Sequence, residues 1–328
     1  MTTATDFTDR TDRYRRELLA HCYRMTASVH DAEDLVQETY LRAWRSFSRF
    51  DDRKASMRTW LYRIAHNACL TALEQRGRRP LPSGLGAPET DPATPLDRLA
   101  GVAWVQPIPG ALLDDGAASA QRGAVDPASV VVSRESVRLA FVAALQHLPP
   151  RQRAVLLLRD VLGWPAAEVA MLLGTTSAGV NSALQRARSQ LVIAAPVEDQ
   201  VVEPTAADDR ELIDRYVAAF ENADVAAIER LLRDDVELEM PPAATWFRGR
   251  DAVGTFLRSR AIAPYRWRML RTRANGGDAV AAYLGDADGR FHAHSIQVCS
   301  VVNGRIAHIH VFQDEALFPT FGLPMTVR

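Results

Sequence analysis

The chain has 328 residues, of which 47% are apolar, and a formal net charge of −1, so it is long enough for two or three ordinary globular domains. It contains no apolar run of membrane-spanning length, and its first residues lack the basic and apolar regions of a signal peptide. Cys22, Cys69 and Cys299 lie far apart without ligand-like spacing. We therefore expect reduced thiols in a cytosolic protein, with no metal site, no cofactor and no membrane association.

Charge is unevenly distributed along the chain. Residues 1–80 carry 15 Lys and Arg against 11 Asp and Glu, and residues 128–195 carry 7 against 3. Residues 81–127 and 196–328 are acidic, with 2 against 6 and 15 against 20. Basic blocks favour a polyanion as partner, although excesses this small also fit a random scatter of surface charge.

Apolar residues recur at helical spacing through residues 7–77. Within them, Asp34 and Glu38 stand one helical turn apart, with Gln37 between them. An acidic edge on a basic segment is a poor contact for DNA and a good contact for another protein.

Cationic and aromatic residues mix directly after this edge. The mixture suits single-stranded DNA, in which bases stack on rings and phosphates need neutralising; the alternative is a core of aromatic residues with solvated arginines. We expect core positions for Trp44, Trp60 and Leu61, and DNA contacts for Arg53, Lys54 and Arg58.

Residues 78–127 are rich in Pro and Gly and predict a linker. They contain an apolar island, Trp104-Val-Gln-Pro-Ile-Pro109. This island either docks on a neighbouring domain or stays in solvent.

Residues 128–194 are again helical, and residues 148–188 predict a helix-turn-helix. Gly174 permits the turn, Thr175 or Thr176 caps the last helix, and Val180 and Leu184 face inward. The outer faces carry Ser177, Asn181, Ser182, Gln185, Arg186 and Arg188, of which the early members can reach base edges and the Arg pair suits phosphates. Gly179 costs the helix roughly 1 kcal/mol, and either allows close approach to DNA or has no role.

A second short linker, residues 196–207, precedes a mixed pattern. Helical stripes occupy residues 212–220, 226–232 and 252–257, and alternating strands are expected at 236–240, 265–273, 279–284, 290–302 and 305–313. Asn303-Gly304 is a strong hairpin signal. Helices followed by a curved antiparallel sheet predict an α+β domain.

Three motifs together resemble the extracytoplasmic-function (ECF) branch of the sigma-70 family of bacterial RNA polymerase sigma factors. They are Asp34-Leu-Val-Gln-Glu-Thr-Tyr-Leu-Arg-Ala-Trp44, Thr59-Trp-Leu-Tyr-Arg-Ile-Ala-His-Asn67 and residues 148–188. The resemblance covers about residues 7–77 and 128–193. It implies two all-α domains, a region 2 helical bundle and a region 4 helix-turn-helix, with core RNA polymerase and promoter DNA as partners.

The resemblance also implies a division of labour along the chain. The first domain would dock on the clamp helices of the polymerase β′ subunit, with the β subunit as a further partner. The loop 51–57 and the helix 58–67 would recognise and help melt the −10 element, the second domain would read the −35 element as a duplex, and the linker would run toward the RNA exit path. The expected polymerase-binding residues are Asp34, Leu35, Gln37 and Glu38; those for the −10 element are Arg53, Lys54, Ser56, Arg58 and Asn67; those for the −35 element are Ser177, Asn181, Gln185, Arg186 and Arg188.

The C-terminal residues are similar to the SnoaL-like domains of the nuclear-transport-factor-2-like superfamily. The similarity rests on the layout and on four motifs: Tyr216-Val-Ala-Ala-Phe220, Trp246-Phe-Arg-Gly-Arg250, Gly304-Arg-Ile306 and Phe318-Pro-Thr-Phe-Gly-Leu-Pro324. It implies a cone-shaped sheet around a pocket, and a tail that regulates the sigma domains in place of a separate anti-sigma protein. The expected pocket residues, for a possible small-molecule ligand, are Trp246, His294, His310 and Asp314; His292 and His308 share strand faces with two of them.

The predicted organisation is region 2 in residues 1–77, a linker in 78–127, region 4 in 128–195, a short linker in 196–207 and a SnoaL-like domain in 208–328. We expect a sigma factor with no catalytic residues. Two alternatives remain: a helix-turn-helix regulator that senses a ligand and needs no polymerase, and a SnoaL-like enzyme whose state the DNA-binding part relays.

Overall fold

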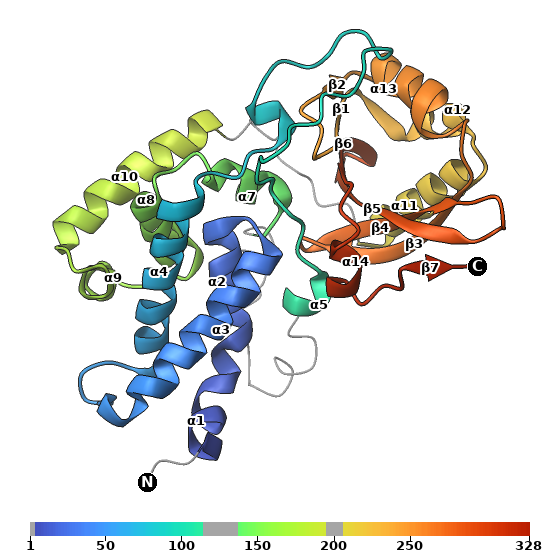
Figure 1. Ribbon diagram of the computed structural model, residues 1–328. Helices are drawn as coiled ribbons and strands as arrows, with labels where there is room; N and C mark the ends of the chain where they lie inside the picture. Colours follow the sequence, from blue (N-terminus) through green and yellow to red (C-terminus); the bar gives the residue numbers. More distant parts are fainter. Residues whose placement is uncertain (1–3, 114–136, 195–205) are drawn as a thin grey trace. The chain divides into compact units, whose positions relative to one another are not determined.

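The computed structural model describes residues 4–113, 137–194 and 206–328 (Figure 1). Their contacts divide the chain into two compact units, Met1–Arg79 with Leu112–Val197, and Pro80–Ala111 with Glu198–Arg328. The predicted linker residues 114–127, the predicted region 4 residues 128–136, and residues 196–205 lie outside the described residues. No helix in the described ranges combines the length and the apolar character that crossing a bilayer requires.

The first part of unit 1 is a helical bundle, as predicted. Its elements are α1 (Ala4–Thr11), η1 (Asp12–Tyr14), α2 (Arg15–Thr26), α3 (Val29–Ser46), η2 (Phe47–Arg49) and α4 (Met57–Arg76). Serine side chains start the two long helices: Ser28 Oγ accepts the Asp31 amide at 3.2 Å, and Ser56 Oγ accepts the Thr59 amide at 3.1 Å.

One core prediction in this bundle is wrong. Leu61 is fully buried and Trp60 is half-buried, but Trp44 is 43% exposed. Phe7 of α1 takes the buried position instead, since it is 7% exposed and packs edge-on against Trp44 and Phe47 at 5.3 and 5.1 Å between ring centroids. Helical periodicity alone does not show that an aromatic residue from another helix fills the core first.

The packing of α2 on α4 brings two cysteines together. Cys22 and Cys69 are both fully buried, and their side chains share a hydrogen bond that, together with burial, raises the pKa of the Cys69 thiol well above its ordinary value. Sequence spacing gives no sign of this pair, because 46 residues separate the two positions.

The second part of unit 1 is the predicted helix-turn-helix. It comprises α7 (Leu139–Leu145), α8 (Pro150–Leu156), the π-turn η4 (Leu157–Val161), α9 (Ala166–Leu173) and α10 (Ser177–Ala194). Gly174 ends α9 in the left-handed conformation, with φ of 63°.

The N-terminus of α10 explains the glycine inside this helix. Thr176 Oγ1 accepts the Gly179 amide at 3.1 Å, so Thr176 is the capping residue. A Cβ at position 179 would stand 2.7 Å from Thr175 Oγ1. Gly179 therefore makes room for the two threonine hydroxyls at the cap.

Unit 2 is an α+β domain. Its helical elements are α11 (Ala206–Glu221), α12 (Val225–Leu231), α13 (Arg250–Phe256), the π-turn η5 (Leu257–Ala261) and α14 (Leu317–Thr320). Its strands are β1 (Leu232–Glu239), β2 (Trp246–Arg248), β3 (Trp267–Ala274), β4 (Gly277–Gly285), β5 (Phe291–Val302), β6 (Arg305–Phe312) and β7 (Thr326–Val327). Figure 1 shows the curved sheet with α11, α12 and α13 beside it.

The sheet has the strand order β2-β1-β6-β5-β4-β3, with β7 on β5. The predicted hairpin is confirmed, because β5 and β6 pair antiparallel and Asn303 and Gly304 have φ of 53° and 70°. The prediction of an antiparallel sheet is wrong for one strand pair, because β1 runs parallel to β6. Buried residues of α11, including Tyr216 and Phe220, pack on the concave face together with Leu238 and Ile309 of the strands.

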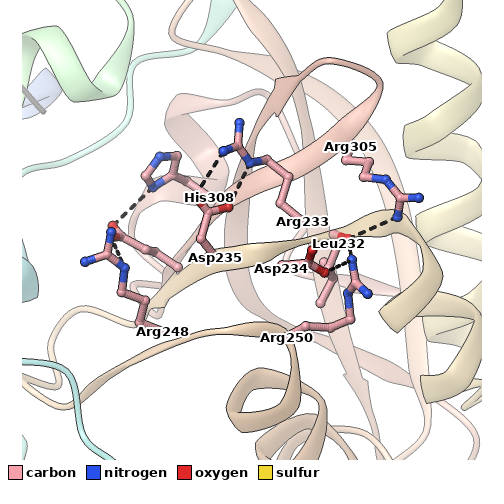
Figure 2. Close-up of polar contacts among 9 residues, drawn as sticks. Leu232, Arg233, Asp234, Asp235, Arg248, Arg250, Arg305 and His308 are labelled. Atoms are coloured by element: carbon pink, nitrogen blue, oxygen red, sulfur yellow. Dashed lines mark hydrogen bonds and ion pairs between the residues drawn. The ribbon is translucent and has the colours of Figure 1, made fainter. Parts of the chain in front are cut away.

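A bulge at the start of β1 is held by arginines (Figure 2). Leu232 pairs with Ile306, but Glu237 is already opposite His308, so four residues of β1 face one of β6. Arg250 and Arg305 converge on the Leu232 carbonyl at 2.9 and 3.3 Å, and Arg250 also pairs with Asp234 at 2.6 Å. These donors replace ladder hydrogen bonds that the bulge removes, which gives Arg250 of the Trp246–Arg250 motif a structural role.

Residues 80–111, predicted as a linker, pack on unit 2. This segment contains η3 (Pro82–Gly84) and enters α5 (Gly110–Leu113). The apolar island docks through fully buried Ile108, which exchanges backbone and side-chain hydrogen bonds with Asn275. Gly110 follows against β3, where a Cβ would lie 2.9 Å from Arg273 Cβ. The linker is thus bound along the C-terminal domain rather than free.

Candidate functional site

One face of α3 is open to solvent. Asp34 and Gln37 are exposed and Glu38 is half-exposed. Leu41 and Trp44 continue the same face one and two turns later, 51% and 43% exposed. Large apolar side chains beside carboxylates at helical spacing form a surface suited to a protein partner.

Leu35, the fourth residue expected on this face, does not lie there. Its side chain is 9% exposed and belongs to the core of the bundle. The exposed apolar residue of the face is Leu41, which helical spacing from Asp34 and Gln37 could have identified.

The residues expected at the −10 element fall into two groups. Arg53, Lys54, Ser56 and Asn67 are exposed. Within the loop, Arg53 pairs with Asp51 at 3.0 Å, which holds the pKa of the Asp51 carboxyl below its ordinary value.

Arg58 forms the second group, because other side chains enclose it. Its guanidinium pairs with Glu17 at 3.0 Å and lies over the rings of Tyr62 and Trp164 at 5.4 and 5.1 Å. Next to it, Thr59 donates to Glu168 at 2.6 Å. Trp164 and Glu168 belong to the helix-turn-helix, so part of the expected −10 surface is covered by region 4 within unit 1.

The outer face of α10 is exposed at each residue expected at the −35 element, namely Ser177, Asn181, Gln185, Arg186 and Arg188. The inner face is buried at Val180, Leu184 and Ala187. Arg188 also makes a bidentate pair with Asp160 at 2.7 and 2.8 Å, which fixes α10 to the π-turn.

Asn67 of α4 and Arg186 of α10 line the same cleft of about 440 Å³. A buried arginine ties the two halves of unit 1 together nearby: Arg153 of α8 donates to the Met25 carbonyl of α2 and, at 2.7 Å, to Gln146 Oε1. Burial lowers the pKa of Arg153 to about 10, so the side chain stays charged at neutral pH. The described halves of unit 1 therefore form one closed body.

Unit 2 contains a cavity of about 450 Å³ between the concave sheet face and the helices. Its walls come from α11, from α13 and the π-turn after it, from strands β1, β3, β4 (through Leu284), β5 and β6, and from linker residues Leu96 and Arg98. None of the described residues lining it is acidic.

Of the four residues expected in a pocket, His294 alone lines this cavity. A bulge in β5 brings it there, because Ala282 pairs with Ser295 and Tyr283 with Ala293, which leaves His294 as the extra residue beside Ser295. Burial lowers the pKa of His294, and the guanidinium of Arg98 acts in the same direction. The imidazole is therefore neutral near pH 7.

Three of the expected pocket residues do not line this cavity, namely Trp246, His310 and Asp314. Trp246 donates its indole N–H to the Gly86 carbonyl at 2.9 Å, and Asp314 accepts the Ala316 amide at 3.0 Å. His310 faces the other side of the sheet from Val311, which lines the cavity.

On that side, His310 belongs to a buried polar cluster with the linker. His310 lies 3.4 Å from Glu239, which also accepts the amide and the hydroxyl of Ser83 at 2.9 and 3.2 Å. Burial raises the pKa of Glu239, but His310 and Ser83 outweigh it and hold the pKa below its ordinary value. A buried carboxylate thus fastens the start of the linker to β1.

Comparison with known proteins agrees with this architecture. Family models match Sigma-70 region 2 at residues 11–79, Sigma-70 region 4 at residues 138–191 and a SnoaL-like domain at residues 213–309. The ECF RNA polymerase sigma factor SigG of Mycobacterium tuberculosis is 50% identical over 324 residues, covering 97% of this chain and 84% of the relative. The chain belongs to the ECF family of RNA polymerase sigma factors.

A second relative and one solved structure are also named as ECF sigma factors. The ECF sigma factor SigJ of Mycobacterium tuberculosis is 30% identical over 250 residues, covering 74% of this sigma factor and 69% of the relative. The crystal structure of an extracytoplasmic function sigma factor SigJ from the same organism superimposes with a TM-score of 0.62 over 97% of this chain and 99% of the other, at 24% identity. The latter likeness shows the fold alone.

Family membership decides between the alternatives raised by the sequence. A sigma factor is a transcription initiation factor and not an enzyme, and sigma factors bind core RNA polymerase and promoter DNA. In this sigma factor the faces of α3 and α10 described above are both exposed to solvent.

Proposed function

We propose that this sigma factor directs promoter-specific initiation through three surfaces, and that its C-terminal domain regulates the other two domains. The observation that carries the DNA-reading part is α10, whose inner face is buried while its polar and cationic residues are all exposed. Asn181 and Gln185 have side chains that pair with adenine edges, and Arg186 and Arg188 suit phosphates.

The polymerase surface in this proposal is the exposed face of α3. Its acidic residues Asp34 and Glu38 would meet basic residues of the β′ clamp helices, and Leu41 and Trp44 would supply the apolar centre of the contact. Further contacts to the β subunit are part of the same proposal.

The −10 element would be read and melted by residues 51–67. Arg53, Lys54, Ser56 and Asn67 are already exposed for this role, whereas Arg58 becomes available once Trp164 and Glu168 withdraw. Aromatic and cationic side chains together favour a separated strand over a closed duplex.

Binding to both promoter elements requires unit 1 to open. The −10 and −35 elements lie about 25 base pairs apart, which is roughly 85 Å of B-form DNA at about 3.4 Å per base pair. Asn67 and Arg186, assigned here to different elements, line one cleft of about 440 Å³. The described arrangement of unit 1 therefore represents a resting state, and opening is part of the proposed mechanism.

The regulatory part of the proposal rests on the linker. Residues 80–111 connect regions 2 and 4 along the chain, and they are bound to the C-terminal domain at Glu239, Trp246 and Asn275. A domain that holds the linker limits how far the two DNA-reading regions can separate, which makes the C-terminal domain an inhibitor of opening.

The test is transcription in vitro with bacterial core RNA polymerase on a library of randomised promoter fragments, with sequencing of the transcripts. We expect the full chain to select a consensus. Asn181→Ala should relax one −35 position by about 1–3 kcal/mol of discrimination, and Arg186→Ala should reduce the salt slope of binding by about 1 without changing the consensus.

Asn222→Ala is the matched control, since Asn222 is an exposed asparagine on the C-terminal unit. An Asn181→Ala consensus identical to that of the wild type would contradict the assignment of α10. A full chain that binds core polymerase but selects no consensus would contradict the promoter-reading proposal as a whole.

A further inference from the structure

We propose that the cavity of unit 2 binds an organic anion with a flat aromatic body. Through Arg98, the bound anion holds the linker against the C-terminal domain. This inference rests on the proposed regulation by the C-terminal domain and deepens it, because it names the class of molecule to which that regulation responds.

The size and lining of the cavity indicate a small organic molecule. A volume of about 450 Å³ lies within the range of roughly 300–1,000 Å³ of small-molecule sites. Phe220, Trp267 and His294 form an edge-to-face row in its wall, with ring centroids 5.6 and 5.0 Å apart. Such walls suit a flat apolar body.

The polar groups deep in the cavity are already paired with each other. Tyr216 donates to Gln297 at 2.8 Å, and Ser295 and His294 share a contact of 3.2 Å. An apolar part of a ligand can lie against these pairs without breaking a hydrogen bond.

Two cations line the cavity where the linker passes. Arg98 comes from the linker itself and Arg260 from the π-turn after α13. Each uses part of its guanidinium on neutral acceptors: Arg98 donates to Gln313 at 2.6 Å, and Arg260 donates to the carbonyls of Ala93 and Thr94. Neither pairs with a carboxylate in these contacts, and each guanidinium has five N–H donors. With no acidic residue among the described lining residues, the chemistry selects a carboxylate, sulfonate or similar anion.

The linker forms part of the cavity wall, so occupancy and linker position are coupled. Leu96 and Arg98 line the cavity, and the residues around them are fixed to the domain by three hydrogen bonds. The Asp97 amide donates to Thr245 Oγ1 at 2.8 Å, the Leu99 amide to the Pro242 carbonyl at 3.3 Å, and the Ala244 amide to the Asp97 carbonyl at 2.7 Å. A ligand that touches Leu96 and Arg98 gains contacts only while these bonds hold, so it stabilises the bound linker.

The experiment compares two dyes that share one scaffold. 8-Anilinonaphthalene-1-sulfonate carries the anion, and N-phenyl-1-naphthylamine lacks it. We expect the full chain to bind the sulfonate in one saturable site, at least tenfold more tightly than the neutral dye. Arg98→Gln should lower the affinity for the sulfonate about tenfold and leave the neutral dye unchanged. Arg290→Gln, on the exposed β4–β5 turn and outside the cavity lining, should change neither.

A second variant and a second measurement distinguish loss of the binding site from misfolding of the variant. Leu284→Trp fills the cavity and should abolish binding of both dyes while circular dichroism stays that of the wild type. Hydrogen exchange at Asp97, Leu99 and Ala244 should slow at least threefold when the sulfonate is bound. Equal affinity for both dyes, unchanged affinity in Arg98→Gln or Leu284→Trp, or unchanged exchange at the three amides would each overturn the inference.

The same protein preparation separates this inference from the proposed function. Promoter-specific transcription without dye binding would overturn the ligand site alone. Dye binding with the expected variant pattern in a chain that selects no promoter would instead overturn the proposed function and leave the ligand site in place.

Discussion

Two histidines of unit 1 illustrate how single buried residues set the conditions under which this protein is stable. Both ring nitrogens of His21 and Nδ1 of His66 are buried without a hydrogen-bond partner. Burial lowers the pKa of His21 to about 3, with His66 and Arg24 adding to the effect, and burial with Arg151 lowers the pKa of His66 to about 4. Both side chains are therefore neutral in the folded protein at any physiological pH.

This neutrality predicts acid sensitivity. In the unfolded chain both histidines bind protons near pH 6.5, whereas the folded chain binds them only near pH 4 and pH 3. Stability should thus fall as the pH drops below about 6.5, by about 1.4 kcal/mol per pH unit for each histidine. His21→Leu should remove about half of this slope, as measured by urea unfolding across about pH 7 to pH 5. His292→Leu, at an exposed position, is the control, and an unchanged slope in His21→Leu would contradict the argument.

The burial of single side chains was predictable where regular helical spacing alone decides which face of the helix they occupy. The inward Val180 and Leu184 and the outward Asn181 and Gln185 of α10 follow directly from helical spacing. His294 is different, because its place in the cavity depends on a bulge that a strand pattern of period two does not contain.

At the scale of elements, α3 presents the clearest protein-binding surface. Trp44 is 43% exposed and also packs edge-on against Phe7, so Trp44→Ala should lower the stability of the bundle but leave it folded, which circular dichroism checks. We expect it to weaken binding to core polymerase by at least about 2 kcal/mol, or roughly 30-fold, as aromatic centres of interfaces do. Fluorescence titration with core polymerase measures the change. Met171→Ala removes an apolar side chain that is 69% exposed on α9 and should have no effect; equal losses in both variants would argue against a specific role for α3.

The contact between α4 and the helix-turn-helix gives the second element-scale prediction. Glu168→Ala removes the acceptor of Thr59, and a net loss of about 0.5–1.5 kcal/mol should shift unit 1 toward the open form roughly 2- to 10-fold. Binding of the free sigma factor to the non-template strand of its selected promoter should rise accordingly. Glu74→Ala removes an exposed carboxylate elsewhere on α4 and controls for charge. Unchanged strand binding in Glu168→Ala would show that this contact does not limit opening.

The elements themselves were mostly predictable, and their pairing was not. Strands β3 to β6 lie within a few residues of their expected positions because alternation and the Asn303-Gly304 turn are local signals. The parallel pairing of β1 with β6 joins residues about 70 positions apart. No local pattern encodes which edge β1 joins, or that a bulge with Arg250 and Arg305 compensates for the lost ladder bonds (Figure 2).

At the scale of the whole molecule, the linker is the part that sequence reasoning described least well. Pro and Gly content correctly indicated the absence of long helices in residues 80–111. It could not indicate binding, because the partners of the linker, such as Glu239 and Asn275, lie more than 150 residues away. Only the apolar island around Ile108 carried a signal for docking.

Releasing the docked linker segment around Ile108 from the C-terminal domain should activate the sigma factor. Ile108→Asp places a charge at a fully buried position, which costs several kcal/mol unless the segment detaches. We expect thermolysin to cleave the linker at least tenfold faster, and promoter-specific transcription with core polymerase to rise. Leu85→Asp, at a linker position that is 45% exposed, should change neither. Faster cleavage without a rise in transcription would separate linker binding from regulation.

The ribosome synthesises the linker before it synthesises the sheet to which the linker binds. Residue 111 leaves the ribosome about 200 residues before the end of β6 at Phe312, a delay of about 10–40 s at roughly 5–20 residues per second. Both sigma regions are complete in the nascent chain well before the sheet that receives the linker exists. Each new molecule therefore passes through a period in which Ile108 and its neighbours have no surface to bind, and a nascent chain is exposed to chaperones and proteases at this segment.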